Sequence, residues 1–160
     1  MSTPPHPFFI RPAFADDATI LTALRRALFE ELGQQLTPEK VAIFENESTA
    51  AFASGLEQGS CLAWIAEADG RAVSSVALLL FPRLPTLDVL AQREAYLLNV
   101  YTAPEWRGRG AATALVAAAV AEARTLGMAR IRLHASAEGQ RIYSAAGFAS
   151  RVDEMELRLG

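Results

Sequence analysis

The sequence contains one cysteine, Cys61, and this scarcity limits the chemistry available to the chain. A single thiol excludes an internal disulfide and any metal site built from several cysteines, and we predict no metal site. Cys61 begins an apolar run that ends at Ile65. Because a thiol in apolar surroundings is poorly ionised, we interpret Cys61 as a buried packing residue and not as a nucleophile.

The chain also lacks an excess of positive charge and a long apolar run. Its net charge of -3 and pI near 5.4 argue against a nucleic-acid-binding surface, which is normally basic. Glu122 and Arg124 interrupt the alanine-rich stretch after Gly110, so no run reaches the ~20 apolar residues that span a bilayer. Residues 1–7 have no charged segment followed by an apolar core, as a signal peptide would. We therefore expect a cytoplasmic protein that does not bind membranes.

At 160 residues and 51% hydrophobic content, the chain is long enough for one sizeable core and short for two. We expect a proline-containing tail over residues 1–7 and a single domain over residues 8–160. Apolar periodicity predicts the order strand, two helices, three strands, helix, strand, helix, strand, with Asp69 and Gly70 as a tight turn. The predicted strands are 8–11, 62–67, 72–80, 95–101, 130–135 and 152–159, and the helices begin at 16, 37, 111 and 137.

Capping residues predict where the first two helices begin and end. Asp16 is expected to cap the first helix, with Ile20 on its core face and Gly33 at its end. Thr37 and Pro38 are a typical N-cap and first-residue pair for the second helix.

A glycine-rich turn lies between the predicted strand 95–101 and the predicted helix 111–126. A turn that opens a helix leaves backbone N–H groups without intrahelical acceptors, and the helix dipole adds positive potential there. Glycines permit close approach of a ligand, and flanking arginines add charge. We therefore predict a phosphate or pyrophosphate site formed by Arg107, Gly108, Arg109, Gly110, Ala111, Ala112 and Thr113.

Two familiar phosphate-binding motifs fit this turn poorly. A P-loop requires a lysine after the glycines, whereas Lys40 is the only lysine in the chain. A dinucleotide-binding turn has a third glycine where this chain has Thr113. It also has an acidic residue in the next strand, where residues 130–135 contain arginines instead.

The turn resembles the coenzyme A pyrophosphate loop of the GCN5-related N-acetyltransferase (GNAT) family. The family pattern is Arg or Gln, two residues, Gly, one residue, and then Gly or Ala, which reads here as Arg107, Gly110 and Ala112. Residues 98–104 match the family's strand before the loop, and residues 142–148 match its late helix signature. The coarse resemblance extends over nearly the whole chain.

This resemblance implies a mixed α/β fold with a central twisted sheet and flanking helices. Two parallel strands, one before the loop and one after its helix, splay apart and take up the pantetheine arm of acetyl-CoA. Val100, Tyr101 and Thr102 then lie along this arm, with the Val100 N–H facing the acetyl carbonyl. Many members carry an asparagine that contacts the cofactor where this chain has Ser136. A serine hydroxyl can also form such a contact, or it can cap the following helix.

The resemblance also implies catalytic roles. A tyrosine at the position of Tyr143 is the general acid in many members, since a phenol of pKa ~10 can protonate a leaving thiolate whose conjugate acid has pKa ~8.5. The other interpretation of Tyr143 is core packing. Glu94 matches the place of the glutamate base in the histone-modifying branch, or is an exposed strand-end charge. His134 is an alternative base, and Asn99 either orients substrate or occupies a bulge.

We therefore predict an N-acetyltransferase in which an amine attacks bound acetyl-CoA directly, without an acyl-enzyme. The acceptor is either a small-molecule amine or a peptide or protein amine, and the sequence does not distinguish the two. Acidic residues that are candidates to attract a cationic amine are Glu30, Glu31, Glu45, Glu47 and Asp88. Two other classes stay open: a non-catalytic acyl-CoA-binding module and a nucleotide-binding regulator. The sequence is also compatible with a homodimer.

Overall fold

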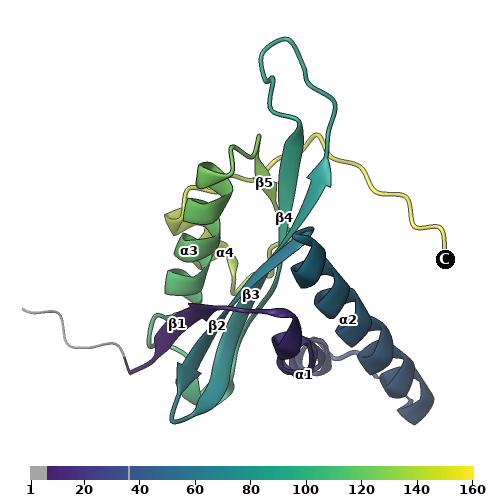
Figure 1. Ribbon diagram of the computed structural model, residues 1–160, viewed down its shortest axis with the longest axis vertical. Coiled ribbons are helices and arrows are strands. Elements are labelled where there is room, and N and C mark those ends of the chain that lie inside the picture. The colour runs from purple at the N-terminus through teal and green to yellow at the C-terminus, as the bar shows by residue number, and fades with distance from the viewer. Residues whose placement is uncertain (1–6, 36) are drawn as a thin grey trace, which may run out of the picture.

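In the computed structural model, which describes residues 7–35 and 37–160, five strands form one sheet with helices on both faces (Figure 1). The predicted tail, residues 1–7, lies outside the described residues except for Pro7. Within the described residues, no helix combines the length and apolar character that crossing a membrane requires. The elements are β1 (Phe9–Pro12), η1 (Ala15–Asp17), α1 (Ala18–Glu31), α2 (Pro38–Gln58), β2 (Cys61–Ala68), β3 (Arg71–Pro82), β4 (Arg93–Thr102), η2 (Pro104–Trp106), α3 (Ala111–Thr125), β5 (Ile131–Arg132) and α4 (Gln140–Ala145).

The sheet has the strand order β1-β2-β3-β4-β5. Its first three pairings are antiparallel, and β4 pairs with β5 in parallel. The predicted tight turn is confirmed, because Asp69 and Gly70 join β2 to β3 with φ of 51° and 71°. Two adjacent residues with positive φ are typical of the turn that matches the twist of a hairpin.

Apolar side chains of the sheet pack against helices on both faces. On one face, Leu115 and Val116 of α3 pack against the core side chains of β3 and β4. On the other face, Leu21 of α1 and Phe52 of α2 cover β2 and β3. Cys61 lies in this second cluster at 2% exposure, and burial raises the pKa of its thiol to about 11. Its predicted packing role is confirmed.

The two predicted helix starts have different outcomes. The Thr37 cap is confirmed, since its hydroxyl accepts a hydrogen bond from the Lys40 N–H at 3.3 Å with Pro38 next to it. Asp16 as the cap of α1 is wrong, because the short η1 helix precedes α1 and the Asp17 carboxylate binds the Phe14 N–H at 2.8 Å. The buried face of α1 is formed by Ala18, Leu21, Thr22 and Leu24, and the predicted core residue Ile20 lies off this face at 38% exposure.

The predicted C-terminal strand is not formed. Residues 152–159 are extended but unpaired, and the chain end leads away from the sheet (Figure 1). An ion pair at 3.3 Å joins Glu154 to Arg132 of β5. Met155 and Leu157 are nevertheless exposed, so no apolar contact fixes the segment as a strand.

Candidate functional site

A bulge in β4 and a splay between β4 and β5 open the sheet near one edge. β3 and β4 change register between Ser75 and Ala77, and Asn99 has φ of 58°, in the left-handed region. The interpretation of Asn99 as a bulge residue is confirmed. On the other edge β4 pairs with β5 through Ala95 and Tyr96. Since β5 ends at Arg132, no described strand faces β4 on that edge from residue 97 onward.

The predicted phosphate loop opens α3 directly after this splay. Gly108 and Gly110 have φ of 73° and 86°, and a Cβ at either position would meet no atom within 4 Å. The first backbone hydrogen bond of α3 is donated by the Ala114 N–H to the Gly110 carbonyl at 3.0 Å. In the described chain, the N–H groups of residues 108–113 therefore have no intramolecular acceptor, and the Cβ positions of Gly108 and Gly110 open into free space. This cradle fits the phosphates of coenzyme A.

A cleft of about 850 Å³ joins the splay, the phosphate loop and the N-terminal side of α4. Most of the predicted cofactor residues line it, and so does the predicted acid: Val100, Tyr101, Thr102, Arg107, Gly108, Gly110, Ala111, Ala112, Thr113, Ser136 and Tyr143. Glu31, one of the acidic candidates, also lines the cleft, and sequence reasoning missed eight others: Leu28, Leu32, Trp106, Ala137, Glu138, Gly139, Arg141 and Ile142. Among the described residues, no three His, Cys, Asp or Glu side chains gather to hold a metal ion.

Arg109, predicted to face the cofactor, is not among the residues that line the cleft. Its guanidinium lies 4.5 Å from the centre of the Trp106 ring and donates to the Glu105 carbonyl at 3.2 Å. Cation–π contact with an indole is favourable, so Arg109 is held on the outside of the loop.

Tyr143 enters the cleft from α4, supported by its neighbours. Its ring packs edge-on against Phe148, with ring centres 6.0 Å apart. A Cβ built on Gly139 would lie 2.7 Å from Tyr143 Cε2, so the ring rests on the Gly139 backbone. Burial, followed by the nearby Tyr96, raises the pKa of the Tyr143 phenol. Tyr143 is therefore protonated at neutral pH, as a proton donor must be.

Gly139→Ala tests this support for Tyr143. Gly139 has φ of -74°, which alanine adopts freely, so the added methyl acts through crowding of the ring. We expect turnover to fall ~10-fold because the hydroxyl is displaced, with a smaller change in coenzyme A affinity. Steady-state kinetics and calorimetry measure the two effects. When Tyr143 is already phenylalanine, Gly139→Ala should cause no further loss of turnover. If the two substitutions instead lower turnover additively, Gly139 does not act by positioning the Tyr143 hydroxyl.

Glu94, the predicted base, does not line the cleft. It is 4% exposed, and its two carboxylate oxygens accept hydrogen bonds from Arg130 at 2.6 Å and Arg132 at 2.7 Å. Burial alone would raise the pKa of Glu94, but the two guanidinium groups outweigh it and lower the pKa below its ordinary value of 4.5. The structure does not bring Glu94 together with Tyr143.

Glu94→Gln is expected to destabilise the fold. It removes a buried charge that holds Arg130 and Arg132, both partly exposed, so we expect the free energy of unfolding to fall by about 2 kcal/mol at pH 7. The lowered pKa means that this stability is present above pH 4.5 and is lost as pH falls through the folded-state pKa. Urea unfolding at several pH values measures it. An unchanged stability with a rate loss confined to low pH would instead restore Glu94 as base.

Ser136 and His134 lie on the segment between β5 and α4. The Ser136 hydroxyl accepts a hydrogen bond from the Gly139 N–H at 3.1 Å, so it caps the turn before α4 while lining the cleft. His134 Nδ1 and the Tyr96 hydroxyl form a short hydrogen bond. His134, the alternative base, is not among the residues that line the cleft.

Glu31 is the acidic candidate that hydrogen-bonds to the phosphate loop. Its Oε2 accepts a hydrogen bond from Arg107 Nη2 at 2.5 Å, and its Oε1 accepts one from the Tyr101 hydroxyl at 3.1 Å. Burial, together with this bond to Glu31, raises the pKa of Tyr101. Arg107 Nε also donates to the Thr102 carbonyl at 3.0 Å. Glu31 thus ties the end of α1 to the loop.

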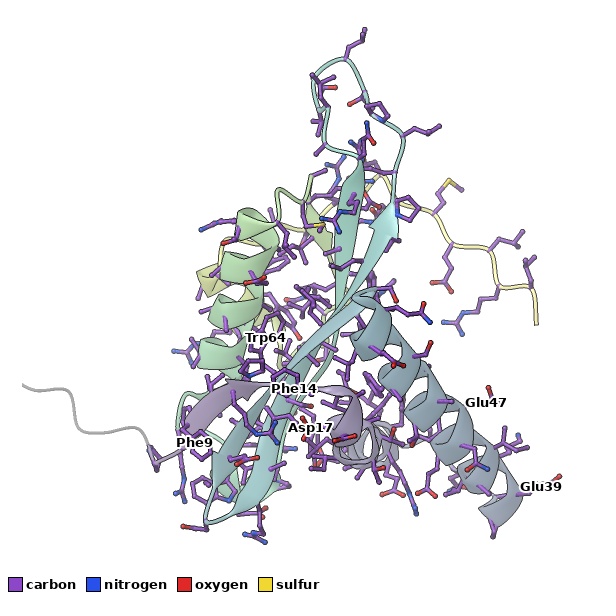
Figure 2. All side chains as sticks on the ribbon, in the orientation of Figure 1. Phe9, Phe14, Asp17, Glu39, Glu47 and Trp64 are labelled. Carbon is purple, nitrogen blue, oxygen red and sulfur yellow. The ribbon has the colours of Figure 1, made fainter. Side chains whose placement is uncertain are left out.

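The other acidic candidates lie elsewhere. Glu30 and Glu45 both bind Arg26, at 2.8 and 2.7 Å, between α1 and α2. Figure 2 shows Glu47 on the outer side of α2, pointing away from the sheet. Asp88 accepts a hydrogen bond from Thr86 in the loop between β3 and β4. None of these four lines the cleft.

A family model and solved structures both relate this chain to acetyltransferases. The model of the Acetyltransferase (GNAT) family matches residues 21–148. The chain is similar to a predicted acetyltransferase from Clostridium acetobutylicum solved with acetyl-CoA, with 28% identity, coverage of 95% of this chain and 96% of that chain, and a TM-score of 0.85. It is also similar to a GCN5-related N-acetyltransferase from Ralstonia eutropha JMP134, with 27% identity, 96% and 99% coverage and a TM-score of 0.83. No curated protein matches the chain.

Proposed function

This chain belongs to the GNAT acetyltransferase family, and from that premise we propose that it transfers the acetyl group of acetyl-CoA to a primary amine by direct attack. The observation that carries this proposal is the single cleft in which the phosphate loop, the β4 splay and Tyr143 meet. A phosphate cradle, an exposed strand edge and a protonated phenol are the parts that acyl transfer from a thioester requires. One continuous domain over residues 8–160 carries them.

Each part of the cleft has a chemical task in this proposal. Acetyl-CoA supplies an activated thioester. The N–H groups of residues 108–113 bind its phosphates, and Arg107 adds charge. The Val100 N–H donates to the acetyl oxygen, which gains negative charge during attack; removal of one such donor costs about 3 kcal/mol in other enzymes. The Tyr143 hydroxyl gives its proton to the departing sulfur as the C–S bond breaks, and the proton that the attacking nitrogen loses passes through water to the tyrosinate and restores the phenol. Ser136 takes the place of the usual asparagine.

Acetyl transfer is tested by turnover of acetyl-CoA against a panel of polyamines, amino acids, aminoglycosides and peptide N-termini. Release of free thiol that depends on one class of amine is the expected result, and it identifies the acceptor. Tight binding of coenzyme A without turnover of any amine would indicate a non-catalytic acyl-CoA-binding module instead.

The cofactor itself is tested by competition. Coenzyme A is expected to displace any ATP or NAD from the cleft, because the loop has neither the lysine of a P-loop nor the third glycine of a dinucleotide site. Isothermal titration calorimetry with each nucleotide in turn measures this. ATP or NAD binding more tightly than coenzyme A would point to a nucleotide-binding regulator.

A further inference from the structure

Glu31 and Glu138 are the carboxylates among the described residues that line the cleft, and Glu31 is the one with bonded partners. Its carboxylate connects two functional parts. Its bond with Arg107 connects it to the phosphate loop. Its bond with Tyr101 connects it to the β4 residue that directly follows Val100. Glu31 therefore lies between the place for an anionic cofactor and the place for the reacting acetyl group.

An anionic cofactor competes with Glu31 for Arg107. The guanidinium has two separate attachments: Nε is bound to the Thr102 carbonyl, and Nη2 is bound to Glu31. The ion pair is open to water, with side-chain exposures of 45% for Arg107 and 39% for Glu31. Such exposed pairs contribute little to stability, so they exchange partners readily. A phosphate oxygen forms a charge-assisted bond to the same Nη2 group, while Nε keeps Arg107 attached to β4.

Resting on the proposed acetyl transfer, we propose that cofactor phosphates take Arg107 from Glu31, and that the freed Glu31 then binds a cationic group of the acceptor amine. Tyr101 keeps its hydrogen bond to the carboxylate and so holds it in the cleft. The Glu31 side chain loses one cationic partner and gains another, so its own charge stays paired.

This exchange specifies the class of acceptor. The nitrogen that attacks a thioester must be neutral, because its lone pair forms the new bond. A carboxylate dedicated to a cation therefore binds a second, non-reacting positive charge. The acceptor is accordingly an amine with at least two cationic groups, such as a diamine, and not a simple monoamine.

The first test measures coenzyme A affinity of Glu31→Gln by calorimetry, without any amine. Because no ion pair has to be broken at Arg107, we expect binding about threefold tighter than in the wild type. Glu30→Gln is the matched control, since Glu30 is the neighbouring residue but binds Arg26 outside the cleft. Unchanged or weaker binding in Glu31→Gln would overturn the exchange, and weaker binding would show that Glu31 holds Arg107 in place for the cofactor.

The second test uses putrescine and butylamine, which have the same length but differ in one charge. Titrated into protein saturated with coenzyme A, putrescine should bind on the order of tenfold more tightly than butylamine, and Glu31→Gln should remove this difference. Equal binding of the two amines to the wild type, or no binding of putrescine, would overturn the assignment of the acceptor class. Both tests measure binding and therefore give a result even if the protein turns over no amine. The absence of turnover would refute the proposed acetyl transfer and not the exchange at Glu31.

Discussion

Gly110→Val is expected to weaken coenzyme A binding by on the order of 10²-fold while the protein remains folded. No atom lies within 4 Å of a Cβ at Gly110, so the new side chain projects into open space beside the free N–H groups of the loop. It therefore occupies the room that the phosphates need. Isothermal titration calorimetry with coenzyme A measures the loss.

Backbone strain has to be separated from obstruction of the ligand. Gly110 has φ of 86°, and valine in this region costs about 1–2 kcal/mol of stability wherever it is placed. Gly127→Val is the matched control, because Gly127 has φ of 67° at the opposite end of α3 and does not line the cleft. Both variants should lose similar stability, and only Gly110→Val should lose coenzyme A. Unchanged affinity in a folded Gly110→Val protein would remove the loop as the phosphate site.

Tyr143→Phe is expected to lower turnover by ~10²-fold or more with little change in stability or coenzyme A affinity. The ring and its contacts with Phe148 and Gly139 remain, and only the phenol proton is lost. The departing sulfur must then leave as an unprotonated thiolate. Steady-state kinetics with the best amine of the panel measures the effect under conditions where chemistry limits the rate.

Tyr96→Phe is the control for this measurement. Tyr96 also has a phenol near Tyr143, but it hydrogen-bonds to His134 and does not line the cleft. We expect less than a threefold change in turnover for this variant, because its phenol is not in reach of the sulfur. If Tyr143→Phe turns over at the wild-type rate, Tyr143 is a packing residue and the general-acid role is wrong.

The parts of the site that are continuous in sequence were predictable. The loop that opens α3 is read from glycine positions and from the strand and helix around it, since such a turn has local geometric requirements. Tyr143 was identified from its own helix signature. The family model that matches residues 21–148 agrees with this reading of the fold.

The contacts that join distant elements were not predictable. Glu31 and Arg107 are 76 positions apart, and neither has a local signal that it lies opposite the other. Glu94 was placed correctly at the start of β4, but its capture by Arg130 and Arg132 depends on the register of β5. Alternation of apolar residues in 152–159 predicted a strand, but alternation specifies a strand only where a surface covers one face.

Acetyl transfer by direct attack is tested most directly by the masses of protein and amine after a single turnover. Protein in excess over acetyl-CoA is mixed with the best amine of the panel, quenched, and both components are analysed by mass spectrometry. We expect one acetyl group on the amine and none on the protein at any time point. An acetylated protein that forms before the product would contradict direct attack, and acetyl-CoA that stays bound and intact would contradict the enzyme.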